Sequence, residues 1–270
     1  MYPILFHIGK IPVRAYSTLI IIGFLIGVVR ATRVAARRME TEPEGSPRRI
    51  SPETVQDIGM LSLLAGIIGA RVLFVLLDWK SFAGRPLDVF KLWEGGLSLH
   101  GGMLFVILFL LGYCRKKKLS FLAVADLVTP SGAITYAFGR VGCFLNGCCY
   151  GSVCDLPWAV RFHAEDNPLG ELTPPSHPVQ LYGTLINLLF FVGLVWWEKR
   201  PHRDGDLFWG YIGLYGLYRF GVEAFRAGAT STYLIPSLHF TDTHLISIVM
   251  GIISLAGLAW LRRGKKQDVS

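Results

Sequence analysis

The chain has 270 residues, of which 52% are hydrophobic and only 17% are charged. Soluble globular proteins have about 25% charged residues, so the composition argues against a soluble single-core enzyme, and a mean hydropathy of +0.45 excludes a disordered chain. The net charge of +8 would suggest nucleic acid in a soluble protein, but in a membrane protein it reports the charge of the loops. Five cysteines are too few for a disulfide-built scaffold. The composition therefore predicts an integral membrane protein with no nucleic-acid partner.

Seven hydrophobic segments approach the length of about 17–25 residues that a membrane-spanning helix needs. In chain order they cover residues 13–29, 55–77, 97–113, 119–138, 178–197, 207–220 and 244–261. The residues before the first segment lack the order of features of a cleavable signal peptide, so we interpret them as a short pre-helix segment. We predict an all-α integral membrane protein with seven transmembrane helices, forming a single domain over residues 1–270.

The basic residues predict the orientation of these helices. They cluster after the first, third and fifth spans and in the C-terminal tail, and these four clusters hold 17 of the 27 Lys and Arg residues. The positive-inside rule places such clusters in the cytoplasm. The N-terminus is then outside and the C-terminus cytoplasmic, which agrees with seven spans. A long outward-facing segment, residues 139–176, follows between spans four and five, and loops of this length are often functional.

Several arginines lie where charge is costly. A charged side chain in the hydrocarbon costs about 2.5–3.5 kcal/mol, so it persists mainly where it pairs or acts. Arg71 lies inside the second span and Arg140 ends the fourth. Arg219, Glu223 and Arg226 follow at the outer end of the sixth, with spacings of four and three that would place them on one helical stripe. The stripe fits either a structural ion-pair ladder or an anion site, and a guanidinium fork suits phosphate.

His100 stands between two pairs of glycines at the outer start of the third span. Glycines at this depth indicate backbone close to a ligand or an unwound helix start. The histidine itself could be a hydrogen-bonding residue, or it could be a general base, because its titration range lies near neutral pH.

Four cysteines, Cys143, Cys148, Cys149 and Cys154, fall within twelve residues of the outward-facing segment. Their spacing does not match the paired C-x2-C units of common zinc or iron–sulfur sites. An outward position would also permit disulfides. Small packing residues, a disulfide and a metal site are the alternatives for this cluster.

Residues 139–151, GRVGCFLNGCCYG, closely resemble the signature of bacterial prolipoprotein diacylglyceryl transferases. Four other blocks resemble motifs of that family and occur in its order: VRAY at 13–16, LSLHGG at 97–102, HPVQLY at 177–182 and RFGVEAFR at 219–226. The chain departs from the family pattern at Cys143, where Asn is common, and at Cys148, where an acidic residue is frequent. It also has Gly183 where Glu is usual, and residues 241–244 lack the usual glutamine.

The resemblance implies transfer of the diacylglyceryl group of phosphatidylglycerol to the lipobox cysteine thiol of a preprolipoprotein, with release of glycerol phosphate. This is the first step of bacterial lipoprotein maturation. The implied partners are phosphatidylglycerol and preprolipoprotein signal peptides that carry a lipobox cysteine. The implied location is the bacterial cytoplasmic (inner) membrane, with a multi-pass chain, expected as a monomer, and its active site toward the outer face. No metal and no organic cofactor is expected.

The residues fit that chemistry. The acceptor thiol attacks as thiolate and has a reference pKa of about 8.5, so a nearby base helps, and His100 is the expected base. Arg219 is expected to act on the phosphate, where charge grows as the phosphate monoester leaves. The residues expected to bind substrate are Arg140, Tyr16, Asn146, Gly151, Glu223 and Arg226.

Two other classes of protein share part of these features. A seven-span transporter or receptor for an anionic ligand would share the arginines and the topology. A cysteine-based redox or metal protein would share the cysteine cluster. Neither would require the signature block and the His-Gly-Gly turn together.

Overall fold

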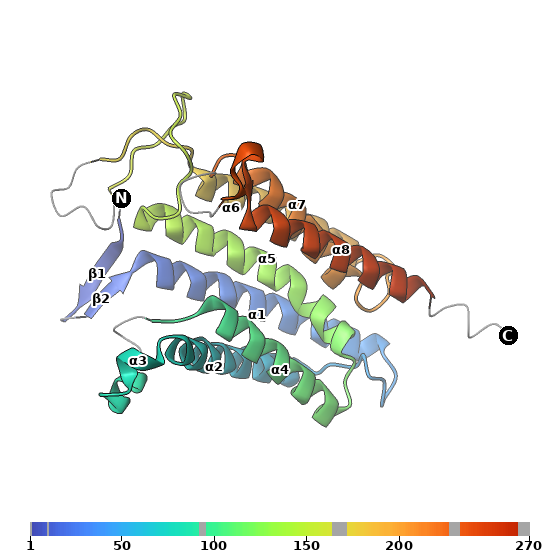
Figure 1. Ribbon diagram of the computed structural model, residues 1–270. Helices are drawn as coiled ribbons and strands as arrows, with labels where there is room; N and C mark the ends of the chain where they lie inside the picture. The colour runs from blue at the N-terminus through green and yellow to red at the C-terminus, as the bar shows by residue number, and fades with distance from the viewer. Residues whose placement is uncertain (1, 10, 92–95, 164–171, 227–232, 264–270) are drawn as a thin grey trace. The chain divides into compact units, whose positions relative to one another are not determined.

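The computed structural model of the chain describes residues 2–9, 11–91, 96–163, 172–226 and 233–263. It is mostly helical, as predicted (Figure 1). The backbone forms two compact units, and each is described separately below. The first unit comprises Met1–Arg30 and Ala125–Ser270, and the second comprises Ala31–Val124.

The first unit begins with an antiparallel hairpin of β1 (Ile4–Ile8) and β2 (Ile11–Arg14), which leads into α1 (Ala15–Thr41). The chain returns to this unit in α5 (Phe121–Asn146) and continues through α6 (Val179–Glu198) and α7 (Asp206–Glu223). A second short antiparallel pair, β3 (Tyr233–Ile235) and β4 (Phe240–Thr241), encloses a single 3-10 turn, Pro236–Leu238, and precedes α8 (Asp242–Arg263). The sequence patterns had not predicted these two hairpins.

Hydrogen bonds and an ion pair join neighbouring elements at both ends of the first unit. At one end the backbone N–H of Tyr2 donates to the Leu145 carbonyl, 3.1 Å away, so the N-terminal hairpin lies against the C-terminal end of α5. At the other end Arg30 of α1 forms an ion pair with Glu198 of α6 and donates to the Leu127 carbonyl of α5 over 3.0 Å. The helices α1 and α5 therefore run antiparallel.

A buried carboxylate fixes the start of α7 at the same end as Arg30. Asp126 is 1% exposed, and its two oxygens accept hydrogen bonds from the backbone N–H groups of Gly205, at 2.7 Å, and Phe208, at 2.8 Å. Helix N-termini carry unpaired donors and a partial positive charge, so a carboxylate from α5 stabilises the start of α7. Nearby, the Arg203 guanidinium donates to the Leu261 carbonyl of α8 over 2.9 Å.

The second unit contains α2 (Pro52–Leu77), the short helix α3 (Trp79–Phe82), the 3-10 helix η1 (Pro86–Phe90) and α4 (Leu99–Lys117). A Cβ added to Gly69 would collide with Phe105 and the Gly101 carbonyl, and one added to Gly102 would lie 3.1 Å from the Gly66 carbonyl. Glycines thus let α2 and α4 approach closely, as small residues do between membrane helices. Gly101 and Gly102 serve this packing within a regular helix, so the alternative of an unwound helix start is wrong.

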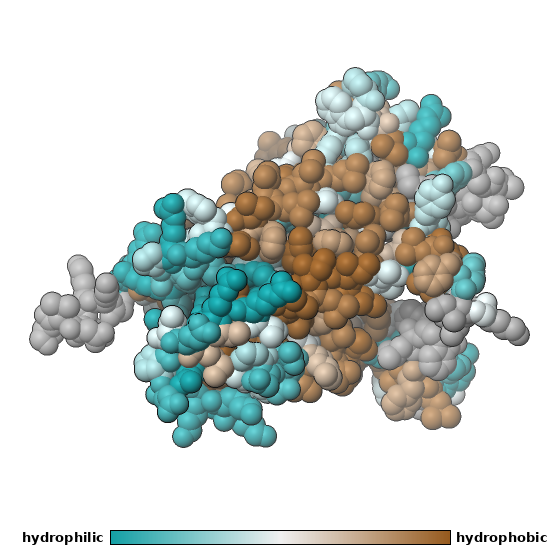
Figure 2. All heavy atoms as spheres, turned by 180° about the vertical axis from the view of Figure 1, so that it is seen from behind, coloured by the Kyte–Doolittle hydropathy of each residue, from teal (hydrophilic) through white to brown (hydrophobic). Residues whose placement is uncertain are grey.

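Five of the described helices, α1, α2, α5, α6 and α8, are long and apolar enough to cross a membrane. The other two long helices are α4 and α7, and the count of seven spans stays a prediction. Large apolar side chains lie exposed along the helices, and Figure 2 shows them gathered over a broad face. Exposing such a surface to water is unfavourable, whereas lipid tails would cover it. The chain is a multi-pass membrane protein.

The first helix differs most from its predicted bounds. Hydropathy ended the first span at residue 29, but α1 continues to Thr41. Arginine and alanine, which dominate residues 30–38, are among the strongest helix formers. Hydropathy marks the end of the apolar run, whereas the hydrogen-bonded helix continues beyond it.

Candidate active site

Arg140 lies in the last two turns of α5, between α6 and α7. Its side chain is buried, with the residue 8% exposed, and its Nε has no hydrogen-bond partner among the described residues. A Cβ added to Gly183 of α6 would lie 3.1 Å from this Nε and would collide with the Tyr218 hydroxyl of α7. The glycine at 183 therefore makes room for Arg140 beside Tyr218. Tyr136, one turn earlier on α5, also interacts electrostatically with the guanidinium.

Arg219 and Glu223 lie on the last turn of α7. The Arg219 guanidinium and the Glu223 carboxylate form an ion pair at 3.5 Å, and Glu223 is fully buried. Arg226 lies in the turn that follows α7, where its N–H donates to the Glu223 carbonyl over 2.9 Å. The predicted helical stripe is therefore wrong for Arg226, because the helix ends at Glu223.

Arg226 nevertheless joins the same charged cluster. Burial, followed by repulsion from Arg219 and Arg140, lowers the pKa of the Arg226 guanidinium. Arg226 thus interacts with Arg219, with Arg140 and with Glu223, and of these Arg140 and Glu223 are buried. Like charges repel more strongly as the local dielectric falls, so a bound anion would stabilise this part of the site.

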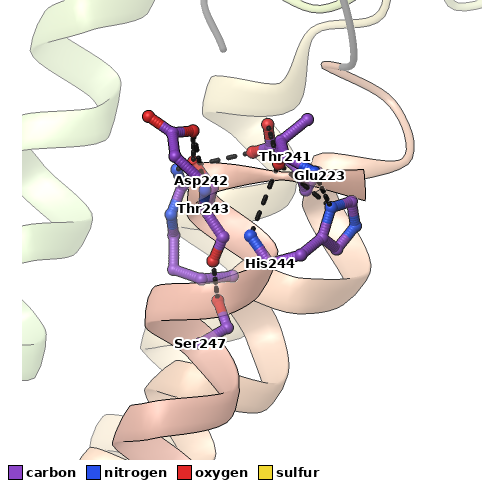
Figure 3. Close-up of polar contacts among 7 residues, drawn as sticks. Glu223, Thr241, Asp242, Thr243, His244 and Ser247 are labelled. Atoms are coloured by element: carbon purple, nitrogen blue, oxygen red, sulfur yellow. Dashed lines mark hydrogen bonds and ion pairs between the residues drawn. The ribbon is translucent and has the colours of Figure 1, made fainter. Parts of the chain in front are cut away.

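The junction of β4 and α8 completes the surroundings of Glu223 (Figure 3). The Thr241 hydroxyl donates to Glu223 Oε1 over 3.3 Å, and the Thr241 N–H donates to His244 Nδ1 over 3.1 Å. Arg219 also reaches the Thr243 hydroxyl at 3.5 Å. Because a backbone N–H can only donate, Nδ1 accepts here and the neutral ring carries its proton on Nε2. Sequence reasoning noted residues 241–244 only as a departure from the family pattern and missed His244 as a site neighbour.

The signature segment leaves α5 at Asn146 and turns back at once. Gly147 and Cys149 have φ of +78° and +62°, and the Cys148 N–H donates to the Cys143 carbonyl over 3.2 Å. Gln180 of α6, fully buried, donates its amide to the Cys148 carbonyl at 2.8 Å.

The thiols that this turn brings together lie next to the arginines. Hydrogen bonds with the Cys143 and Cys148 thiols, and then the nearby Arg140 and Arg226 guanidinium groups, lower the pKa of the Cys149 thiol.

Tyr16, Asn146 and Gly151 surround this turn. Tyr16 lies at the start of α1, where a Cβ on Gly142 would come within 2.9 Å of its Cα, and it interacts electrostatically with Arg140. The Asn146 side chain interacts with the Cys148 thiol. Gly151 donates its N–H to the His177 carbonyl over 2.9 Å, and any Cβ there would collide with the Phe225 carbonyl. The glycine at 151 has a packing reason of its own.

His100 belongs to the second unit, as the second residue of α4, and its side chain is exposed. The candidate charge in that unit is Arg71 of α2. Its guanidinium donates to the carbonyls of Asp88, Val89 and Gly96 at 2.6, 2.7 and 3.0 Å. Arg71 therefore anchors the chain that leads into α4 and His100. The structure assembles the other predicted residues, apart from His100, within the first unit.

An apolar pocket of about 630 Å³ lies beside the arginine cluster in the first unit. Its walls come from α6, α7 and the segment between α5 and α6, and they include Trp158, Tyr182, Leu217, Tyr218 and Phe225. Tyr218 lines the pocket and also adjoins Arg140. The first unit thus joins a buried cationic cluster to an apolar pocket, an arrangement that suits a ligand with an anionic head and a hydrocarbon tail.

Comparison with known proteins gives the family. The sequence profile described as prolipoprotein diacylglyceryl transferase matches residues 3–260. The chain belongs to this family. Proteins named phosphatidylglycerol–prolipoprotein diacylglyceryl transferase resemble it over almost their whole length. One from Vibrio cholerae is 35% identical over 98% of this chain and 94% of its own. One from Geobacter sulfurreducens is 33% identical over 97% of this chain and 96% of its own.

Proposed function

We propose that this protein transfers the diacylglyceryl group of phosphatidylglycerol to the lipobox cysteine thiol of preprolipoproteins. Its membership of the transferase family supports this activity. The observation that carries the proposal is the arginine cluster of Arg140, Arg219 and Arg226 beside an apolar pocket. A phospholipid has a phosphodiester that the arginine cluster can bind and acyl chains that the apolar pocket can hold.

The arginines divide the donor lipid between them. Arg140, with a buried Nε and tyrosine neighbours, binds the phosphatidylglycerol headgroup. Arg219 contacts the phosphate, and Glu223 and Arg226 hold it in place. A guanidinium binds phosphate through two parallel hydrogen bonds, which fixes orientation as well as charge. The other residues that bind substrate, by hydrogen bonds or by making room, are Tyr16, Asn146 and Gly151.

The reaction breaks a carbon–oxygen bond. The thiolate of the lipobox cysteine forms a bond to the glyceryl carbon, and the phosphate oxygen leaves with the electron pair as glycerol phosphate. Arg219 stabilises the charge that grows on this phosphate. His100 takes up the proton of the attacking thiol.

The site faces the outer side of the cytoplasmic (inner) membrane, and the chain acts as a monomer with seven spans. Charge segregation within the first unit supports this orientation. Arg30, Arg203 and the exposed basic residues at the ends of α6 and α8 (Lys199, Arg200, Arg262 and Arg263) lie at the end where α7 begins, opposite the end that holds Glu223. Basic residues mark the cytoplasmic side of membrane helices.

A reconstituted assay tests the activity. Purified protein, vesicles containing phosphatidylglycerol and a lipobox peptide should yield a peptide heavier by one diacylglyceryl group, with release of glycerol phosphate. A peptide with serine in place of the lipobox cysteine, and vesicles of phosphatidylcholine, serve as matched controls. Unchanged peptide mass with phosphatidylglycerol, under conditions where the protein stays folded, would exclude the proposed activity.

The role of His100 is tested by its pH dependence. A general base contributes about 10²–10⁴-fold, and His100→Gln cannot take up the proton. The fall in turnover of His100→Gln relative to wild type should become smaller as the pH rises toward the pKa of the substrate thiol, about 8.5. The thiol then ionises without a base. Turnover of the variant and of the wild type is compared at saturating lipid, from neutral pH up to about pH 8.5. A constant ratio at every pH would make His100 a binding residue.

A further inference from the structure

Three of the clustered cysteines meet at one point in the first unit. Cys143 comes from the last turn of α5, and Cys148 and Cys149 come from the turn that follows it. Their three sulfur atoms lie within 4.8 Å of one another, and all three are free thiols. Sulfurs that share one zinc ion, each about 2.3 Å from the metal, are about 4 Å apart. The observed separations therefore need to close by less than about 1 Å.

The backbone holds this arrangement in place. Cys149 has φ of +62°, a left-handed conformation that costs a residue with a side chain about 1–2 kcal/mol. The Cys148 backbone is fixed on both sides, because its N–H donates to the Cys143 carbonyl and its own carbonyl accepts from Gln180. The turn thus presents Cys148 and Cys149 toward the end of α5. Such preorganisation lowers the entropic cost of binding a ligand.

The surrounding charges suit an anionic complex. Three thiolates and one divalent ion carry a net charge of −1, which is costly at membrane depth unless it is compensated. The guanidinium groups of Arg140 and Arg226 both interact with Cys149 and supply that compensation. Hard cations that prefer oxygen ligands would find only sulfur in this cluster.

We propose that Cys143, Cys148 and Cys149 form a binding site for a thiophilic metal ion of the zinc class. Within the described residues, no fourth histidine, cysteine or carboxylate joins the three. The fourth coordination position would fall to a ligand from outside the cluster, such as water or a thiol. Binding displaces the protons of the three thiols. None of its ligands is assigned a role in the proposed transfer reaction, but Arg140 and Arg226, which compensate its charge, also serve the lipid phosphate there, so the tests below measure metal binding and not turnover.

Metal content gives the first test. The full-length protein, purified in detergent with its thiols kept reduced, is loaded with zinc, freed of excess metal and analysed for zinc per chain. The wild type should retain one zinc ion, and the double variant Cys148→Ser/Cys149→Ser should retain none. Cys154→Ser is the matched control, because Cys154 is a free thiol nearby in the chain but outside the group. Absence of zinc in the wild type, or its retention by the double variant, would overturn the site.

Thiol protection gives a second test that needs no variant. Zinc should shield Cys143, Cys148 and Cys149 from iodoacetamide, and a chelator should restore their modification. Cys154 should be modified equally with and without zinc, and peptide mass mapping separates the four positions. Equal modification of all four thiols with zinc present would contradict the proposal, and so would a disulfide among the three in the reduced preparation.

Discussion

Arg71 and Arg140 are two buried arginines on membrane helices, and their guanidinium groups have different surroundings. Arg71, in the second unit, donates to four backbone carbonyls between Asp88 and Gly96 and stacks near Phe74 and Phe82. Arg140, in the first unit, lies near the positive charge of Arg226, and its buried Nε has no hydrogen-bond partner among the residues that the structure describes. Both residues are about equally buried, at 7% and 8% exposed.

The comparison shows that the cost of a buried charge can be met in two ways. Carbonyl oxygens compensate Arg71 within the fold, so its charge stabilises a loop and leaves little capacity for a ligand. Positive charges gather near Arg140 instead, because Arg226 interacts electrostatically with both Arg140 and Arg219, while Glu223 pairs with Arg219. A buried guanidinium therefore indicates a binding site only after its partners have been identified.

The largest effect is expected at Arg140. The substitution Arg140→Lys keeps the positive charge but loses the planar fork and the buried Nε, so turnover should fall about 100–1,000-fold. Thermal stability should change little, because the guanidinium makes no hydrogen bond through Nε that the fold depends on. Transfer in phosphatidylglycerol vesicles and the unfolding temperature are measured together. Near-normal turnover in the lysine variant would contradict the assignment of Arg140 to the headgroup.

A smaller effect is expected at Glu223. In Glu223→Gln the hydrogen bond from Thr241 can remain, but the ion pair with Arg219 is lost. Charge-assisted hydrogen bonds contribute about 1.5–3 kcal/mol, so turnover should fall about 10–100-fold. Lipid binding should be kept or strengthened, because the cluster becomes more positive. A rise in KM with unchanged kcat would instead make Glu223 a residue that binds the lipid directly.

Much of this cluster could be predicted from the sequence. Cost arguments and motif resemblance singled out Arg140, Arg219, Glu223 and Arg226, and the structure assembles them in one unit. Local spacing and motif resemblance carried these predictions, because the residues lie close together in the sequence at the ends of apolar runs. The end of α7 was the exception, since three polar residues at helical spacing do not reveal that the helix stops at Glu223.

The rest depends on contacts between distant segments. His244 lies 21 residues after Glu223 and meets it through Thr241, with a β-turn region between them that no periodicity indicates. The three sulfurs converge because Cys149 adopts a left-handed backbone, which the C-x2-C spacing rule does not consider. The glycine pairs beside His100 indicate backbone close to a ligand or an unwound helix start, whereas in the structure Gly101 and Gly102 pack α4 against α2. Glycines allow close approach of a ligand as well as close packing of helices, and the sequence alone does not distinguish the two roles.

The smallest effect on turnover is expected at Arg71. An ammonium group in Arg71→Lys cannot reach the four carbonyls that the guanidinium joins, so at least one charge-assisted hydrogen bond worth about 1.5–3 kcal/mol is lost. The unfolding temperature should therefore fall by several degrees, and proteolysis between α3 and α4 should become faster. Turnover below that temperature should stay within a few-fold of wild type, because the Arg71 guanidinium binds backbone carbonyls of its own unit and has no assigned role in the reaction.

This pair of arginine variants decides whether the comparison holds. Arg140→Lys should lose activity and keep stability, and Arg71→Lys should lose stability and keep activity. If Arg71→Lys lost activity as severely as Arg140→Lys with an unchanged unfolding temperature, Arg71 would contact a substrate and its carbonyl partners would be incidental. Arg71→Lys could also lower both turnover and the unfolding temperature. If its turnover then rose with pH in the same way as that of His100→Gln, the loop that Arg71 anchors would be the element that positions His100.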